Sequence, residues 1–73
     1  GTADLQATRA YLRWLDTQLR SAAQGGLDLN EVLRLPVPAP YRDWAAVSTE
    51  YRRNVMHLYP AYEQRELQPA PAR

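Results

Sequence analysis

The stretch LRWLDTQLR, residues 12–20, decides the fold. Leu12, Leu15 and Leu19 recur at the three- and four-residue spacing that places side chains on one face of an α-helix. Trp14 falls on nearly the opposite face of that helix. Since one apolar face is enough to build the core of a small helical protein, the sequence predicts a second apolar surface at this point.

The same pattern continues in both directions and predicts a helix over residues 3–24. Thr2 is the expected N-cap, and Gly25-Gly26 is the expected stop, because glycine adopts the left-handed conformation that ends helices. The expected buried face consists of Leu5, Thr8, Leu12, Leu15, Leu19 and Ala22, with Tyr11 on its flank. The second stripe consists of Ala3, Ala7, Ala10 and Trp14.

A short helix over residues 29–34 follows. Asp28 and Glu31 have the spacing of a capping box, and Leu27 and Val32 have the spacing of the hydrophobic staple that accompanies it. The following segment Pro36–Pro40 is predicted to be a stiff, extended connector, because its alternating prolines favour polyproline geometry and contain no P-x-x-P motif.

A helical turn over residues 41–47, anchored by Trp44, is expected after the connector. The last main helix is predicted over residues 49–67, with Ser48 or Thr49 as its N-cap. Pro60 lies inside this helix and is expected to kink it near Met56. Its expected buried face consists of Tyr51, Val55, Leu58, Tyr59 and Tyr62.

These elements predict an all-α fold, a small helical domain with two longer helices that bracket a short one and fold back antiparallel. Residues 1–67 form a single helical segment, and residues 68–73 form a disordered tail. A chain of 73 residues without cysteine is marginally stable alone. We therefore expect it to be part of a larger protein.

Composition excludes several functional classes. The net charge is +1 with nine scattered arginines, which gives no basic face for nucleic acid. No apolar run is long enough for a membrane span, and no signal peptide is recognisable. The expected partners therefore include neither nucleic acid nor membrane. Localisation stays open between the cytoplasm and the periplasm of a bacterium.

No residue pattern indicates catalysis or metal binding within this chain. His57 is the only histidine and has no carboxylate one helical turn away, so a metal site is not expected. Ser48 is interpreted as a helix cap rather than a nucleophile, and Glu63 and Glu66 are interpreted as solvated surface residues. We therefore predict no catalytic, metal-binding or cofactor-binding residue here.

The aromatic residues suggest an interface instead. Tyrosine and tryptophan bury large apolar areas and keep a polar atom, a combination that suits protein–protein contacts. The alternative is that the helices bury these side chains within the chain itself. The predicted interface residues are Ala7, Ala10, Trp14, Tyr41 and Trp44.

Two longer stretches, RAYLRWLDTQLRSAAQGGLDLNEVLRLPVP and YRDWAAVSTEYRRNVMHLYPAYEQREL, together carry a family resemblance over about residues 5–67. They resemble the C-terminal helical extension of metallo-β-lactamase-fold hydrolases, in the branch that includes quinoprotein relay system zinc metallohydrolases. The positions that carry the resemblance are Arg9, Tyr11, Leu12, Leu15, Gly26, Trp44, Arg53, Asn54, Ala61, Tyr62 and Glu66.

The resemblance implies a parent protein with a four-layer αβ/βα sandwich that binds zinc and hydrolyses ester, amide or thioester bonds. The family's His-x-His-x-Asp-His motif is absent here, so no catalytic residue carries over. The chain would be a non-catalytic tail that packs on the catalytic domain or mediates association, with Ala3, Ala7, Ala10 and Trp14 facing that domain. The alternative is a stand-alone interaction module that pairs with a second copy of itself.

Overall fold

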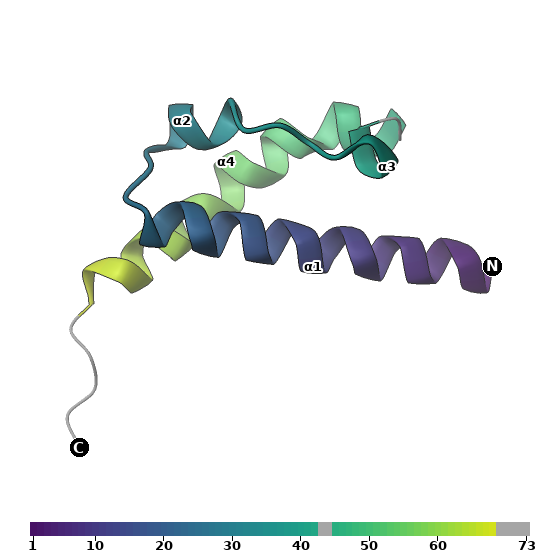
Figure 1. The fold of residues 1–73 in the computed structure, drawn as a ribbon, viewed down its shortest axis with the longest axis horizontal. Helices are drawn as coiled ribbons and strands as arrows, with labels where there is room; N and C mark the ends of the chain where they lie inside the picture. Colours follow the sequence, from purple (N-terminus) through teal and green to yellow (C-terminus); the bar gives the residue numbers. More distant parts are fainter. Residues whose placement is uncertain (43–44, 69–73) are drawn as a thin grey trace, which may run out of the picture.

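The computed structural model describes residues 1–42 and 45–68, without the side chains of Pro40 and residues 45–49. The described residues contain no strand, which confirms the all-α prediction. Trp44 and residues 69–73 of the predicted tail lie outside the described part. The helices are α1 (Thr2–Gln24), α2 (Leu29–Leu33), α3 (Ala39–Arg42) and α4 (Ala45–Leu67), as Figure 1 shows.

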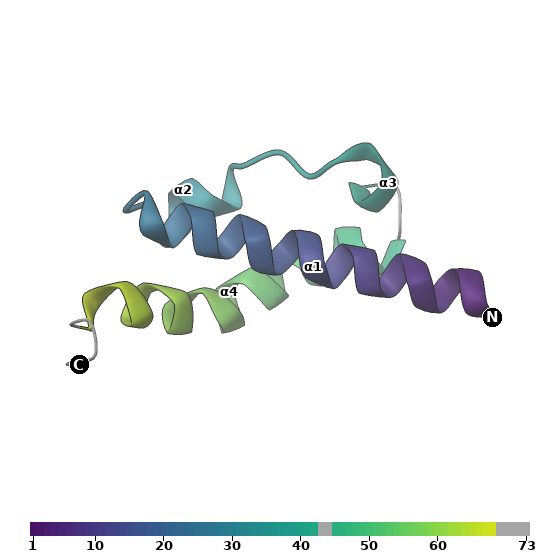
Figure 2. The same cartoon turned by 60° about the horizontal axis from the view of Figure 1, so that its bottom comes forward.

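The two long helices run in the same direction, so the predicted antiparallel arrangement is wrong. Tyr51, early in α4, lies beside Trp14, with ring centroids 5.9 Å apart. Glu66, late in α4, lines a hollow together with Gln24 at the end of α1. The segment 25–42 returns along α1 toward its N-terminus before α4 begins (Figure 2). This long return path is what allows two helices close in sequence to lie parallel.

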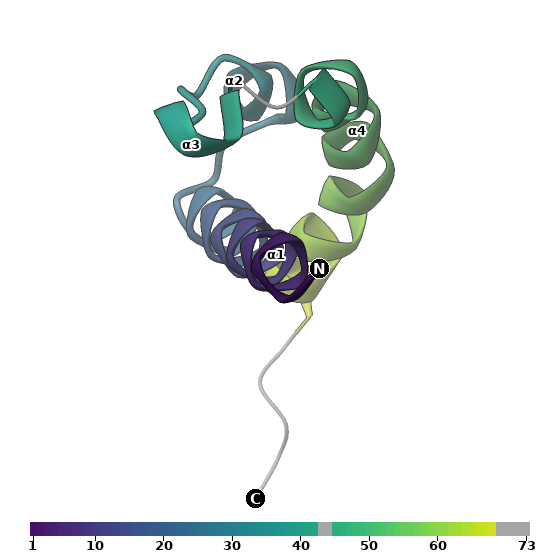
Figure 3. The same ribbon diagram turned by 90° about the vertical axis from the view of Figure 1, so that its right-hand side faces the viewer.

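The core forms where α2 and the C-terminal half of α1 pack on α4. Figure 3 shows the helices arranged around this centre, viewed along α1. The described buried side chains are Tyr11, Leu15, Leu19, Ala22, Ala23, Val32, Tyr51, Val55 and Tyr59. Tyr59 is fully buried, and its hydroxyl donates a hydrogen bond to the Leu27 carbonyl oxygen at 2.6 Å. This bond ties α4 to the loop between α1 and α2.

Four residues assigned to buried faces from the sequence are exposed. Leu5 and Leu12 of α1 are 53% and 54% exposed, Thr8 between them is exposed, and Leu58 of α4 is 39% exposed. The three assignments on α1 are wrong because the covering helices leave this side of its N-terminal half open. Tyr11 in the same half is buried beside Tyr41 on another side of α1, and the leucine pattern continues without a partner.

The end of α1 has the local geometry that its glycines predict. Gly26 has a φ of 76°, and the backbone N–H groups of Leu27 and Gly26 donate to the carbonyl oxygens of Ala22 and Ala23, both at 3.0 Å. These two bonds form the Schellman motif, which satisfies carbonyl groups that the helix leaves open.

Several predicted boundaries are wrong by a few residues. Gly1 rather than Thr2 is the N-cap of α1. Ser48 and Thr49 lie inside α4, because that helix begins at Ala45. Ala39 and Pro40 belong to α3 rather than to the extended connector, since proline suits the first turn of a helix.

Pro60 lies inside α4 as expected. The helix continues for seven residues beyond it, to Leu67. The kink that this proline is expected to cause near Met56 stays a prediction.

The capping box of α2 is confirmed and gives a testable prediction. The Asp28 carboxylate accepts from the Glu31 backbone N–H at 2.8 Å, and the Glu31 carboxylate accepts from the Asp28 backbone N–H at 3.0 Å. Asp28→Ala should lower the free energy of unfolding by about 1 kcal/mol, because the Glu31 backbone N–H loses its side-chain acceptor. Urea denaturation measures the loss. Asn30→Ala, an exposed change in the same helix, is the control, and an equal loss there would contradict the assignment.

Candidate functional site

The exposed surface that best fits a function is the N-terminal seam of α1, which we define as Leu5, Thr8 and Leu12. These residues are spaced like the a and d positions of a heptad repeat, and Leu15, Leu19 and Ala22 continue the repeat into the core. The Thr8 hydroxyl donates to the Asp4 carbonyl oxygen at 2.9 Å, so its hydrogen bond is made within the helix. The seam therefore presents two leucines and a threonine methyl group to solvent.

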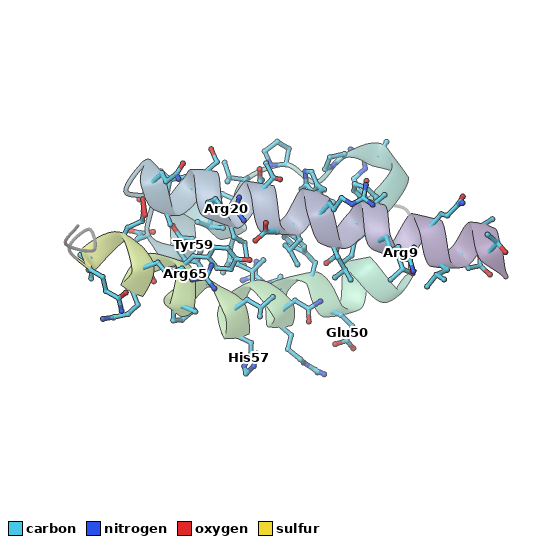
Figure 4. All side chains as sticks on the ribbon, turned by 90° about the horizontal axis from the view of Figure 1, so that it is seen from below. Arg9, Arg20, Glu50, His57, Tyr59 and Arg65 are labelled. Atoms are coloured by element: carbon cyan, nitrogen blue, oxygen red, sulfur yellow. The ribbon has the colours of Figure 1, made fainter. Side chains whose placement is uncertain are left out.

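Charged residues border the seam on both sides. Asp4 precedes it at a g position, with its side chain 94% exposed, and Arg9 lies at an e position on the other side. The amino group of Gly1 lies 3.4 Å from the Asp4 carboxylate. Among the described residues, Arg9 forms no ion pair. Figure 4 shows Arg9 on the N-terminal half of α1, far from Arg20 and Arg65 near its other end.

The predicted interface residues occupy a different side of α1. Trp14 and Tyr41 are half-buried against each other, with centroids 5.4 Å apart. Tyr11 and Tyr51 complete an aromatic cluster with them, so Trp14 packs within the chain rather than opposite its core. This packing gives Trp14 and Tyr41 a structural role, and their role in an interface stays a prediction.

Ala7 is half-buried and Ala10 is exposed. Neither residue lies in the exposed seam. Sequence reasoning missed the seam because it assigned Leu5 and Leu12 to the core. Their heptad spacing was the available signal, but spacing alone does not tell a covered leucine from an exposed one.

A polar cluster joins the C-terminal halves of α1 and α4. Asp16 accepts hydrogen bonds from the Tyr62 hydroxyl at 2.7 Å and from Arg20 at 2.6 Å, and Arg65 lies 5.2 Å from the centroid of the Tyr62 ring. Burial and the hydrogen bond to Asp16 raise the pKa of Tyr62 above its usual value, so the phenol keeps its proton at neutral pH. The cluster links two helices and contains no activated nucleophile.

The residues considered for catalysis or metal binding, His57, Glu63 and Glu66, lie on α4. His57 is exposed on α4, and Figure 4 shows it pointing away from α1. Glu63 is half-buried and Glu66 is exposed, and both line hollows at the surface near the end of α4. Within residues 1–42 and 45–68, no three histidine, cysteine or carboxylate side chains are grouped as a metal site requires. No helix among these residues has the length and apolar character needed to cross a bilayer.

Comparison with known proteins leaves the site to be interpreted from its own geometry. No family model, no curated protein and no solved structure matches this chain.

Proposed function

We propose that this chain is a non-catalytic helical segment that binds another polypeptide through the N-terminal seam of α1. One observation carries the proposal: a leucine heptad that is buried in one half of α1 continues, more than half exposed, in the other half. Two leucines on one stripe of a preformed helix are a common element of helix-in-groove and helix–helix recognition. Met56 is also exposed, but on another helix, and single exposed apolar residues need no functional explanation.

A second proposal is that the parent protein is a metallo-β-lactamase-fold zinc hydrolase and that the chain is its C-terminal segment. It is supported by the sequence resemblance alone. Of the residues that carry this resemblance, Tyr11, Leu15 and Gly26 serve the core or the helix end of this chain. Leu12 and Arg9 lie at the exposed seam and beside it. The mass and zinc content of the native polypeptide test this second proposal.

The binding role is tested by site-specific photo-crosslinking in the cell that makes the protein. A photoreactive residue at Leu12 should give a crosslinked product of discrete mass, because the seam lies against its partner. Thr17 is the matched control, since it is exposed on the other side of the same helix. Equal products from both positions, or none from Leu12, would contradict a partner at the seam.

A further inference from the structure

We propose that the partner of the N-terminal seam is a second copy of this chain, paired in parallel along the first half of α1. This inference rests on the proposed binding role of the seam. Parallel pairing about a twofold axis sets Leu5 against Leu5 and Leu12 against Leu12 of the second copy. Each copy then covers the two leucines that the other leaves exposed.

The charges beside the seam identify the partner and its direction. In a parallel pair of helices, a residue at g lies beside the e residue five positions later on the partner helix. Asp4 and Arg9 stand at these g and e positions, so two Asp4–Arg9 ion pairs form between the copies. Their separation of five residues prevents the same pairing within one helix, where charges meet at three or four residues.

An antiparallel pair is disfavoured by the same residues. Bringing Leu5 opposite Leu12 of an antiparallel copy places the symmetry axis between Thr8 and Arg9. The two Arg9 side chains then meet across the axis on the same edge, and like charges there oppose association. The charge pattern of the seam therefore selects the parallel arrangement.

The contact is limited to the first half of α1. Beyond Leu12 the same stripe of the helix is occupied by α4, since Asp16 is hydrogen-bonded to Tyr62. The two helices must diverge at this point. A contact of fewer than two heptads is short for a coiled coil, so we expect reversible dimers that form at high micromolar concentrations.

A charge exchange between the two positions tests this pairing on the full chain. Asp4→Arg and Arg9→Asp each replace both ion pairs by repulsion, so each variant alone should dimerise about tenfold more weakly than the natural chain. Mixed in equal amounts, the two variants regain both ion pairs and should dimerise as strongly as the natural chain. Sedimentation equilibrium measures each association, and circular dichroism checks that the exposed substitutions leave the helices intact.

Three outcomes overturn the inference. The first is a natural chain that stays monomeric up to about 1 mM. The second is a pair of single variants that dimerise as strongly as the natural chain, and the third is a mixture that dimerises no more strongly than either variant alone. These outcomes are distinguishable from failure of the binding role itself. A monomeric purified chain whose Leu12 position still crosslinks in cells to a different polypeptide keeps the binding role and excludes the second copy. An absent crosslink at Leu12 removes the binding role.

Discussion

Replacing Leu19 by alanine should lower the free energy of unfolding by about 3 kcal/mol, whereas Leu12→Ala should lower it by less than about 0.5 kcal/mol. The two leucines are one heptad apart on α1 and undergo the same chemical change. Leu19 is fully buried, so its truncation leaves a cavity among core side chains. Leu12 is 54% exposed and leaves none. A core of this size supplies only about 3–5 kcal/mol, so the Leu19→Ala chain should keep at most about 2 kcal/mol and unfold at much lower urea concentration.

Urea denaturation followed by the helical circular dichroism signal measures both losses. The experiment is run at low micromolar concentration, where association through the seam does not contribute to stability. Equal losses at the two positions would contradict the arrangement of α4 over only one half of α1. A large loss at Leu12 alone would place the core in the other half of the helix.

This pair of leucines also marks the limit of what the sequence predicts. Periodicity shows correctly that Leu12 and Leu19 share one stripe of a helix. It contains no information on how far along that stripe the covering helix extends. That extent depends on where α4 crosses α1, which is set by contacts between residues more than forty positions apart, such as Asp16 and Tyr62.

Features determined by neighbouring residues were predicted well. The capping box of Asp28 and Glu31 and the glycine stop at Gly26 depend on hydrogen bonds and backbone angles within a few residues. The parallel course of α1 and α4 was not predictable in this way. It depends on the path of the segment 25–42, and no single motif in that segment encodes a direction.

The candidate site also combines features that neighbouring residues determine with features that distant contacts determine. Trp14 was interpreted as a surface residue because it lies far from Leu15 and Leu19 around the helix. Both α3 and α4 contact α1 here, so its buried arc is wide enough to include Trp14 beside Tyr41 and Tyr51. The seam is the remainder of the expected core face, left exposed where the covering elements lie on another side of α1.

Alkaline pH should unfold this protein, and buried tyrosines are the cause. Burial is the largest factor that raises the pKa of Tyr51, Tyr59 and Tyr62 above the usual value of 10, since the charged phenolate loses its hydration. The nearby Glu63 carboxylate raises the pKa of Tyr59 further. The folded state therefore holds these protons more tightly than the unfolded state does.

The direction of the pH effect follows from this difference. The stability that these protons contribute is complete below pH about 10, where both states are protonated, and is lost as the pH rises through the higher pKa values of the folded state. Between the pKa of the unfolded state and that of the folded state, each such tyrosine lowers the free energy of unfolding by about 1.4 kcal/mol per pH unit. The chain contains no lysine, so no ammonium side chain titrates in the same range.

Two tyrosine-to-phenylalanine substitutions distinguish the effect of tyrosine ionisation on stability from the effect of side-chain packing. Tyr51→Phe and Tyr59→Phe should both flatten the alkaline loss of stability, because each removes one linked proton. At pH 7 they should differ. Tyr59→Phe removes the hydrogen bond to the Leu27 carbonyl and should cost about 1 kcal/mol. Tyr51→Phe should cost nothing, because the buried Tyr51 hydroxyl has no hydrogen-bond partner among the described residues.

Urea denaturation at a series of pH values, with tyrosinate absorbance recorded in parallel, measures both effects. The natural chain should lose stability steeply only above pH about 10. A stability that stays level to pH 12, or Phe variants with the slope of the natural chain, would mean that these phenols reach water in the folded state. The tyrosine-rich core would then be more open than the complete burial of Tyr59 indicates.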